Sequence, residues 1–204
     1  MKKQIIIIAA LFVVLGAAKA QHDHGAHGKS NFSKKDQSMH AGMKMGKEGT
    51  MTYEVSIDFQ NQLSEVYNAT LKLTDSLISG DAEKISNSSS IVKETLGKVD
   101  MSLLKSSEAH MDWMMNLKVM NAALDQISST EDIKDQRTAY TSFNKALYKS
   151  IKAFGTTTET IYYQHCPMAL DSQGAFWLSN NKEIRNPFFG GSMLSCGSTS
   201  ETIN

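Results

Sequence analysis

Both cysteines of the chain lie near its C-terminal end, and each has a methionine close by in the sequence. Met168 follows Cys166 by two positions, and Met193 precedes Cys196 by three. Thiolate and thioether sulfurs are soft ligands that select Cu(I), and imidazole also suits copper. A fold that brings the two pairs together would surround one monovalent ion with four sulfur atoms. The predicted metal ligands are Cys166, Met168, Met193 and Cys196, with His165 as a less certain fifth.

The spacing within each pair is compatible with convergence on one ion. Pro167 excludes a helix interior, and side chains two positions apart in an extended chain point to the same side, about 6.6 Å apart along the strand. The three-residue step from Met193 to Cys196 places both on one side of a helical turn. Glycines on either side of this second pair allow the backbone to fold tightly around a centre.

A disulfide between Cys166 and Cys196 is the main alternative to a metal site. Pairing is the default for cysteines in an oxidising compartment, and this loop would contribute roughly 3–4 kcal/mol through chain entropy. Spacing alone does not separate the two interpretations. A disulfide gives no reason for the flanking methionines, so these favour metal. The disulfide could also be the oxidised, metal-free form of the same site.

Charge and motif content argue against other function classes. Lys and Arg together number 21, as do Asp and Glu, so the net charge is zero and no nucleic-acid-binding surface is expected. His165 adjoins Cys166, where an extended chain points the two side chains apart, and no orienting acid is evident. A Cys-x-x-Cys exchange motif is absent from the sequence. We therefore predict no enzymatic activity.

The N-terminal twenty residues have the pattern of a secretory signal. Lys2 and Lys3 precede an apolar run over 5–14, and Ala18-Lys19-Ala20 is a small-x-small cleavage site. We expect cleavage after residue 20, export to the periplasm, and no stable membrane insertion of the mature chain, since its apolar runs are shorter than a span of about twenty residues.

Residues 21–50 are rich in His, Met, Gly, Lys and Ser and poor in apolar residues, which predicts a disordered tail. Four of the six histidines fall within this tract, which favours metal contact over the alternative of a solvated linker with accidental histidines. Imidazole and thioether ligands without fixed spacing would capture metal loosely. The candidate tail ligands are His22, His24, His27, His40, Met43 and Met45.

Residues 51–155 show helical periodicity. Apolar residues recur at alternating three- and four-residue steps over 59–77, 82–99, 113–127 and 140–154. Ser79-Gly80-Asp81 ends one helix and caps the next, the acids before residue 133 start the fourth, and Gly155 stops it. We therefore predict an all-α domain, an antiparallel four-helix bundle with short connections. His110 and the methionines Met111, Met114 and Met115 are expected to be core or boundary residues.

Residues 156–204 lose this period and are rich in Gly and aromatic residues. The run Ile161-Tyr162-Tyr163 favours β structure, but the prediction for the segment is an irregular chain that packs on the bundle through Trp177 and nearby phenylalanines and carries the metal site.

The C-terminal motifs resemble a known signature. Four motifs are similar to the end of a bacterial exported domain of unknown function, number 3347. They are Cys166-Pro167-Met168-Ala169, a Gly-Ala-x-Trp-Leu-Ser run from Gly174, an Ile-x-Asn-Pro-Phe-x-Gly run from Ile184, and Met193-Leu194-Ser195-Cys196-Gly197. The resemblance covers about residues 53–197. That domain occurs alone after a signal peptide or attached to periplasmic adaptor subunits of heavy-metal efflux pumps. The resemblance implies copper or related heavy-metal handling, with the two Cys/Met pairs as ligands.

The expected function is therefore a periplasmic heavy-metal-binding protein, for Cu(I) first, that sequesters the ion or delivers it to an efflux component. Silver could share the soft site, and zinc would tolerate the thiolates and imidazole. The alternative is a disulfide-stapled envelope interaction module without metal function.

Overall fold

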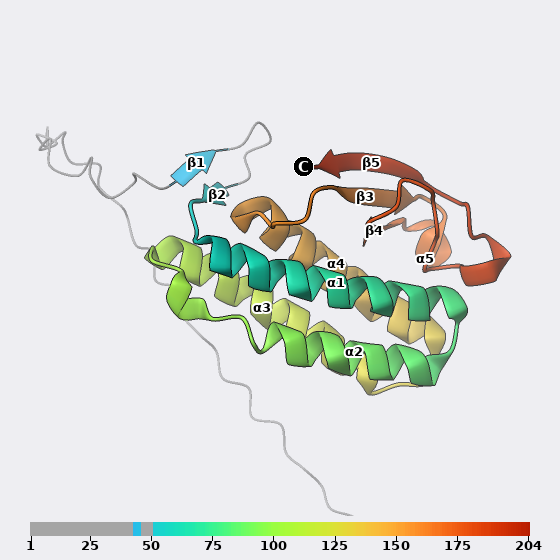
Figure 1. Cartoon of the computed structure of the whole chain (residues 1–204). Helices are drawn as coiled ribbons and strands as arrows, with labels where there is room; N and C mark the ends of the chain where they lie inside the picture. Colours follow the sequence, from blue (N-terminus) through green and yellow to red (C-terminus); the bar gives the residue numbers. More distant parts are fainter. Residues whose placement is uncertain (1–42, 46–50) are drawn as a thin grey trace, which may run out of the picture. The chain divides into compact units, whose positions relative to one another are not determined.

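The computed structural model describes residues 43–45, as backbone only, and residues 51–204. Four long helices make up most of the described chain (Figure 1). Short connections join them, and each packs against its neighbours in sequence. Within the described residues, no helix is long and apolar enough to cross a membrane. The helices are α1 (Ile57–Ser79), α2 (Ala82–Leu96), α3 (Ser107–Ser128) and α4 (Ile133–Phe154).

Each long helix begins at a side chain that caps its first turn. The oxygens of Ser56, Asp81, Ser106 and Asp132 accept hydrogen bonds from backbone amides two or three residues later, which satisfies donors that have no partner inside the helix. At the break between α1 and α2, Gly80 adopts a left-handed conformation with φ 71°, which a glycine takes without steric cost. The predicted helix breaks after Ser79 and before Ile133 are thus confirmed.

The predicted apolar stripes face the core. Their members are buried, except Ala82 and Leu117, which are partly buried. At one end of the helices, the rings of Phe59, Trp113 and Phe154 contact one another at centroid distances of 5.2–5.9 Å. Periodicity therefore located the faces on which the helices pack.

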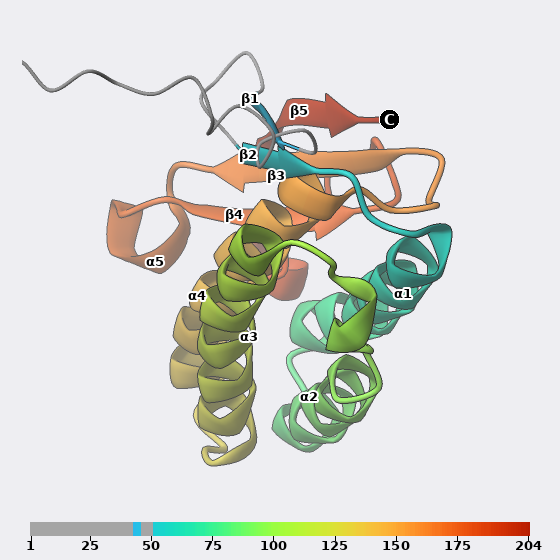
Figure 2. The same ribbon diagram turned by 90° about the vertical axis from the view of Figure 1, so that its left-hand side faces the viewer.

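The C-terminal segment differs from the predicted irregular chain. It forms a three-stranded antiparallel sheet in the order β4-β3-β5, so the all-α prediction is wrong for this part. The sheet lies over the α1 and α4 side of the helices (Figures 1 and 2), and the backbone amide of Leu178 donates to the Asn144 side chain on α4 at 3.2 Å. Its strands are β3 (Ile161–Cys166), β4 (Ala175–Ser179) and β5 (Ser198–Ile203).

Short elements complete the described chain. Strand β1 (Met43–Met45) pairs with β2 (Met51–Tyr53), and η1 (Met101–Leu103) links α2 to α3. Between the sheet strands lie α5 (Ala169–Ser172) and η2 (Gly190–Ser192). The single turn of α5 is left-handed, with φ between 53° and 68° at its last three residues.

The segments between the sheet strands lie at the end of the helices where α4 begins. The ammonium of Lys134 pairs with the carboxylate of Asp171 at 2.9 Å, and Arg137 Nε donates to the carbonyl of Pro187 at 2.8 Å. The chain enters α1 at the opposite end, where Tyr53 stacks on Phe154 at the end of α4. The two ends therefore carry different parts of the chain (Figure 1).

Candidate functional site

The sheet brings the two cysteines together. Cys166 is the last residue of β3 and is fully buried. Cys196 is partly buried and lies two residues before β5, which pairs with β3 so that Ser198 is opposite His165. The Sγ atoms are 2.8 Å apart. Antiparallel pairing of β3 with β5 therefore determines this approach.

The distance between the sulfurs places the pair between two chemical states. A disulfide bond is about 2.05 Å long, and both residues are free thiols here. Two thiolates on one tetrahedral zinc ion, each about 2.3 Å from the metal, would be roughly 3.8 Å apart. The observed separation equals neither value, so the side chains have to rearrange either to form a disulfide or to share an ion.

The surroundings of Cys196 favour its protonated form. Its thiol pKa is raised, first because it shares a hydrogen bond with Cys166, and then because of partial burial and the negative charge that Cys166 carries when ionised. A metal ion needs the thiolate, so binding would release protons and would strengthen as the pH rises.

Asn186 holds the loop that carries Cys196. Its side chain is fully buried; Nδ2 donates to the carbonyl of Cys196 at 2.8 Å, and Oδ1 accepts from the amide of Phe188 at 2.8 Å. Its backbone amide donates to the carbonyl of Leu194, also at 2.8 Å. Sequence reasoning did not assign this residue a role, although an Asn-Pro dipeptide is a known turn signal.

Gly197 permits the close approach of β5 to β3. At φ +136°, a Cβ atom there would lie 2.7 Å from the carbonyl oxygen of His165 and 3.0 Å from the ring of Trp177. Gly190 is similarly restricted, with the carbonyl oxygen of Ile78 at 2.7 Å, whereas Gly191 has nothing within 4 Å. The close packing expected around the second Cys/Met pair therefore depends on Gly190 and Gly197 but not on Gly191.

The two methionines of the predicted site remain in contact with solvent. Met168 precedes α5 and is 51% exposed; Met193 follows η2 and is 37% exposed. Among residues 51–204, no group of three or more His, Cys, Asp or Glu side chains is arranged to hold a metal ion.

His165 takes part in a row of aromatic rings. Its imidazole stacks on Phe176 at 4.1 Å, Phe176 on Tyr163 at 4.9 Å, and Tyr163 on Tyr148 at 3.9 Å. Neighbouring residues in a strand point to opposite faces, so its ring lies away from the side chain of Cys166. The structure brings together the two cysteines but gives His165 a different set of neighbours.

The remaining predicted ligands lie in the tail. His22, His24, His27 and His40, together with the signal sequence, lie outside the described residues. Met43 and Met45 are described only as backbone of β1.

The methionines near the start of α3 contradict the sequence prediction. Met111, Met114 and Met115 were expected in the core, but their side chains are 64%, 41% and 61% exposed. His110 beside them is exposed as well. The stripe through Trp113 and Met120 faces the core, and these methionines occupy other directions around the helix.

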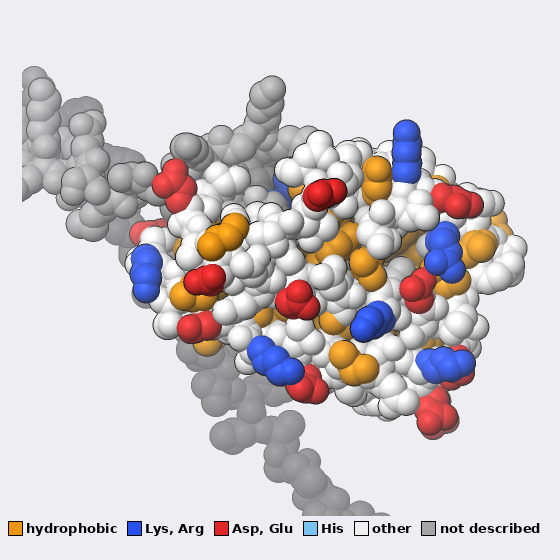
Figure 3. All heavy atoms as spheres, viewed as in Figure 1, with side chains coloured by type: hydrophobic (Ala, Val, Ile, Leu, Met, Phe, Trp, Pro, Cys, Tyr) orange, Lys and Arg blue, Asp and Glu red, His pale blue; other side chains and the backbone are white. Residues whose placement is uncertain are grey.

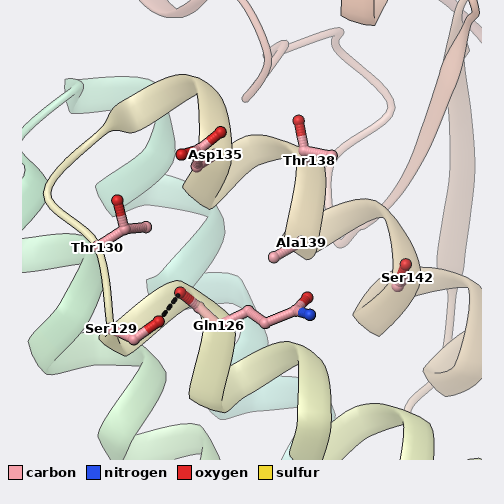
Figure 4. A pocket seen from close by; sticks show the side chains of 7 residues that line it. All are labelled: Gln126, Ser129, Thr130, Asp135, Thr138, Ala139 and Ser142. Atoms are coloured by element: carbon pink, nitrogen blue, oxygen red, sulfur yellow. Dashed lines mark hydrogen bonds between the residues drawn. The ribbon is translucent and has the colours of Figure 1, made fainter. Parts of the chain in front are cut away.

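One hollow, at the turn from α3 to α4, has a different chemistry. Its volume is about 350 Å³, and it is lined by hydroxyl, amide and carboxylate side chains with one alanine (Figure 4). Its lining contains neither thiol, thioether nor imidazole. The residues are Gln126, Ser129, Thr130, Asp135, Thr138, Ala139 and Ser142.

Charges are mixed on the surface. Acidic and basic side chains alternate over the face shown in Figure 3, as the balanced composition leads one to expect.

The family match covers only the helical part of the chain and the few residues that follow it. Residues 66–159 match the model of a family described as a protein of unknown function (DUF3347). This stretch is a domain of unknown function. The match is slightly shorter than half of the 204-residue chain and ends before β3, so it does not include either cysteine. No curated protein and no solved structure matches the chain.

Proposed function

We propose that this chain is an exported, periplasmic soft-metal-binding protein whose cargo is Cu(I), held by Cys166 and Cys196. The observation that carries the proposal is that β3 and β5 bring the two cysteines together on segments that each also carry an exposed methionine. Two thiolates at one point form a strong soft donor set. In this proposal the helices act as an antiparallel four-helix bundle that supports the sheet.

Met168 and Met193 are the proposed neutral ligands of the same ion. Their side chains lie partly in solvent on the segments that carry the cysteines, so neither is needed to fill the core. Thioethers bind Cu(I) in preference to harder ions. Silver would occupy the same donor set, and zinc would gain little from the methionines.

The proposed role is sequestration or delivery to a periplasmic efflux component. The His/Met-rich residues of the tail would capture metal and raise its concentration near the folded part, as a tethered second module does. This role rests on the sequence pattern of residues 1–50.

A disulfide-stapled interaction module is the second candidate, and the short distance between the sulfurs favours it. The bond would close a loop of about thirty residues and contribute about 4 kcal/mol through chain entropy. The two candidates differ in what the flanking methionines do.

The test is Cu(I) competition against a chromophoric chelator with the reduced, anaerobic protein. Cys166→Ser and Cys196→Ser should each lower the affinity at least a hundredfold, because a hydroxyl cannot replace a charged thiolate. Met168→Leu and Met193→Leu should each lower it by about threefold to thirtyfold while thermal melts stay unchanged. Equal Cu(I) affinity in all five proteins would contradict the metal proposal. If reductant lowers the melting temperature in that case, the disulfide-stapled interaction module is the remaining candidate.

A further inference from the structure

An exposed group of soft side chains occupies one face of α3 near its start. It consists of His110, Met111, Met114 and Met115, and we call it the α3 Met/His face. These methionines do not stabilise the core. Burying a methionine side chain contributes roughly 1.5–3 kcal/mol to folding, and an exposed one does not make this contribution. Contiguous apolar side chains at a surface mark a binding function more often than scattered ones do.

The helical positions allow these side chains to meet over one ion. His110 and Met114 are four residues apart, as are Met111 and Met115, while Met111 and Met114 are three apart. Such pairs have Cβ atoms about 5–6 Å apart on one side of a helix. Methionine has three rotatable bonds and a polarizable sulfur, so two thioethers can turn toward an imidazole without any change in the backbone.

The charges nearby are compatible with a cation. Glu108 and Asp112 lie in the same turns of the helix, and Lys118 follows Met114 by one turn. The face differs in this respect from an apolar docking surface, which would need neither an imidazole nor flanking acids. Leucine or isoleucine would serve docking as apolar side chains, but unlike thioether and imidazole they cannot bind a soft metal.

The chain enters its helices next to this face. The carboxylate of Asp112, next to Met111 in sequence, helps to raise the pKa of the Tyr53 hydroxyl in β2, after burial, and the Tyr53 ring stacks on Phe154 at 5.2 Å. Backbone pairing sets Met43 opposite Tyr53. Strand β2 therefore lies beside the turn of α3 that carries Met111.

We propose that His110, Met111 and Met114 form a second site for a monovalent soft cation, Cu(I) or Ag(I), with Met115 as an alternate ligand. This goes beyond the proposed function because the site lies on another element and uses neither cysteine. The start of α3 and the loops that carry the cysteines lie near opposite ends of the helices, so one ion cannot satisfy both. Neutral ligands predict weaker binding than at the thiolates.

The experiment follows the methionine methyl groups of the full chain by NMR while silver nitrate is added in chloride-free buffer. Carbon-13 labelling of the methyl groups and single Met→Leu variants assign each signal. The protein carries Cys166→Ser and Cys196→Ser, so the cysteine pair takes up no silver. The methyl signals of Met111 and Met114 should shift together and saturate. Met120, buried on the same helix, is the internal control and should not shift.

A matched variant tests the imidazole. His110→Gln should weaken silver binding at Met111 and Met114 by about fivefold to fiftyfold, and the exposed position keeps the helix intact. Unmoved Met111 and Met114 signals at silver levels that saturate other methionines would overturn the proposal. Concentration-dependent broadening of these signals without silver would overturn it in favour of a docking face for a second copy. The outcomes are independent of the cysteine site, which is judged from the Cu(I) affinity of the cysteine variants.

Discussion

Substitution of Gly197 by alanine should be far more damaging than its size suggests. The new Cβ would lie 2.7 Å from the carbonyl oxygen of His165, well inside a favourable contact of about 3.5 Å. Overpacking of this kind costs about 1–3 kcal/mol, and holding a non-glycine residue at φ +136° adds about 1–3 kcal/mol. We expect the free energy of unfolding to fall by about 2–6 kcal/mol.

Urea denaturation of the reduced protein measures this loss. With a slope of about 2 kcal/mol per molar urea, the midpoint should fall by roughly 1–3 M. Gly191→Ala is the matched control, because nothing lies within 4 Å of a Cβ there, and its free energy of unfolding should stay within about 0.5 kcal/mol of the parent.

The same variant tests the link between the sheet and the site. If β5 is pushed away from β3, Cys196 moves away from Cys166, and the disulfide should form less readily in a glutathione redox titration than in the Gly191→Ala protein. Equal midpoints for the two glycine variants would refute the packing argument. A lower midpoint with an unchanged redox equilibrium would show that β5 does not position Cys196.

Two further outcomes are expected of the same region. The raised pKa of the Cys196 thiol contributes stability that is complete below the ordinary thiol pKa of about 8.5 and is lost as the pH rises through the folded value. The urea midpoint of the reduced protein should therefore drop as the pH rises above about 8.5, and it should drop less in Cys196→Ser. Asn186→Ala should cost about 2–3 kcal/mol, because the buried amide of Phe188 and the carbonyl of Cys196 lose their partner, whereas Asn180→Ala at an exposed position should leave the midpoint unchanged.

The helices were predictable because their core residues repeat at a helical period and their ends carry local signals. Asp81 and Asp132 each precede a helix and cap it, and Gly80 supplies the left-handed residue between two of them. Such signals act over three or four residues, so one sequence contains them in full.

The sheet was not predictable in the same way. Strand β3 shows as the Ile161-Tyr162-Tyr163 run, but β5 is mostly polar and has no buried residue among its six. Its pairing with β3 depends on contacts between residues far apart in the chain, and no local pattern encodes them. The sequence therefore identified the two cysteines as candidates, but it could not show whether the fold brings them together.

For the α3 methionines, the sequence prediction was wrong although the local pattern held the information. Met111, Met114 and Met115 were grouped with the core because methionine is apolar, yet Trp113 and Met120 define the buried direction of that helix. At 100° per residue, Met111 and Met115 point well away from it. Position around the helix, rather than residue type, would have identified them as surface residues.

The two soft-donor groups should respond differently to oxidation. The thiols of Cys166 and Cys196 lie close enough together for a disulfide to form in an oxidising compartment. An oxidised chain would lose its thiolate ligands and keep the thioethers and imidazole of the α3 Met/His face, which form no disulfide. Under this proposal, oxidation would abolish metal binding at the cysteine pair but not at the α3 Met/His face.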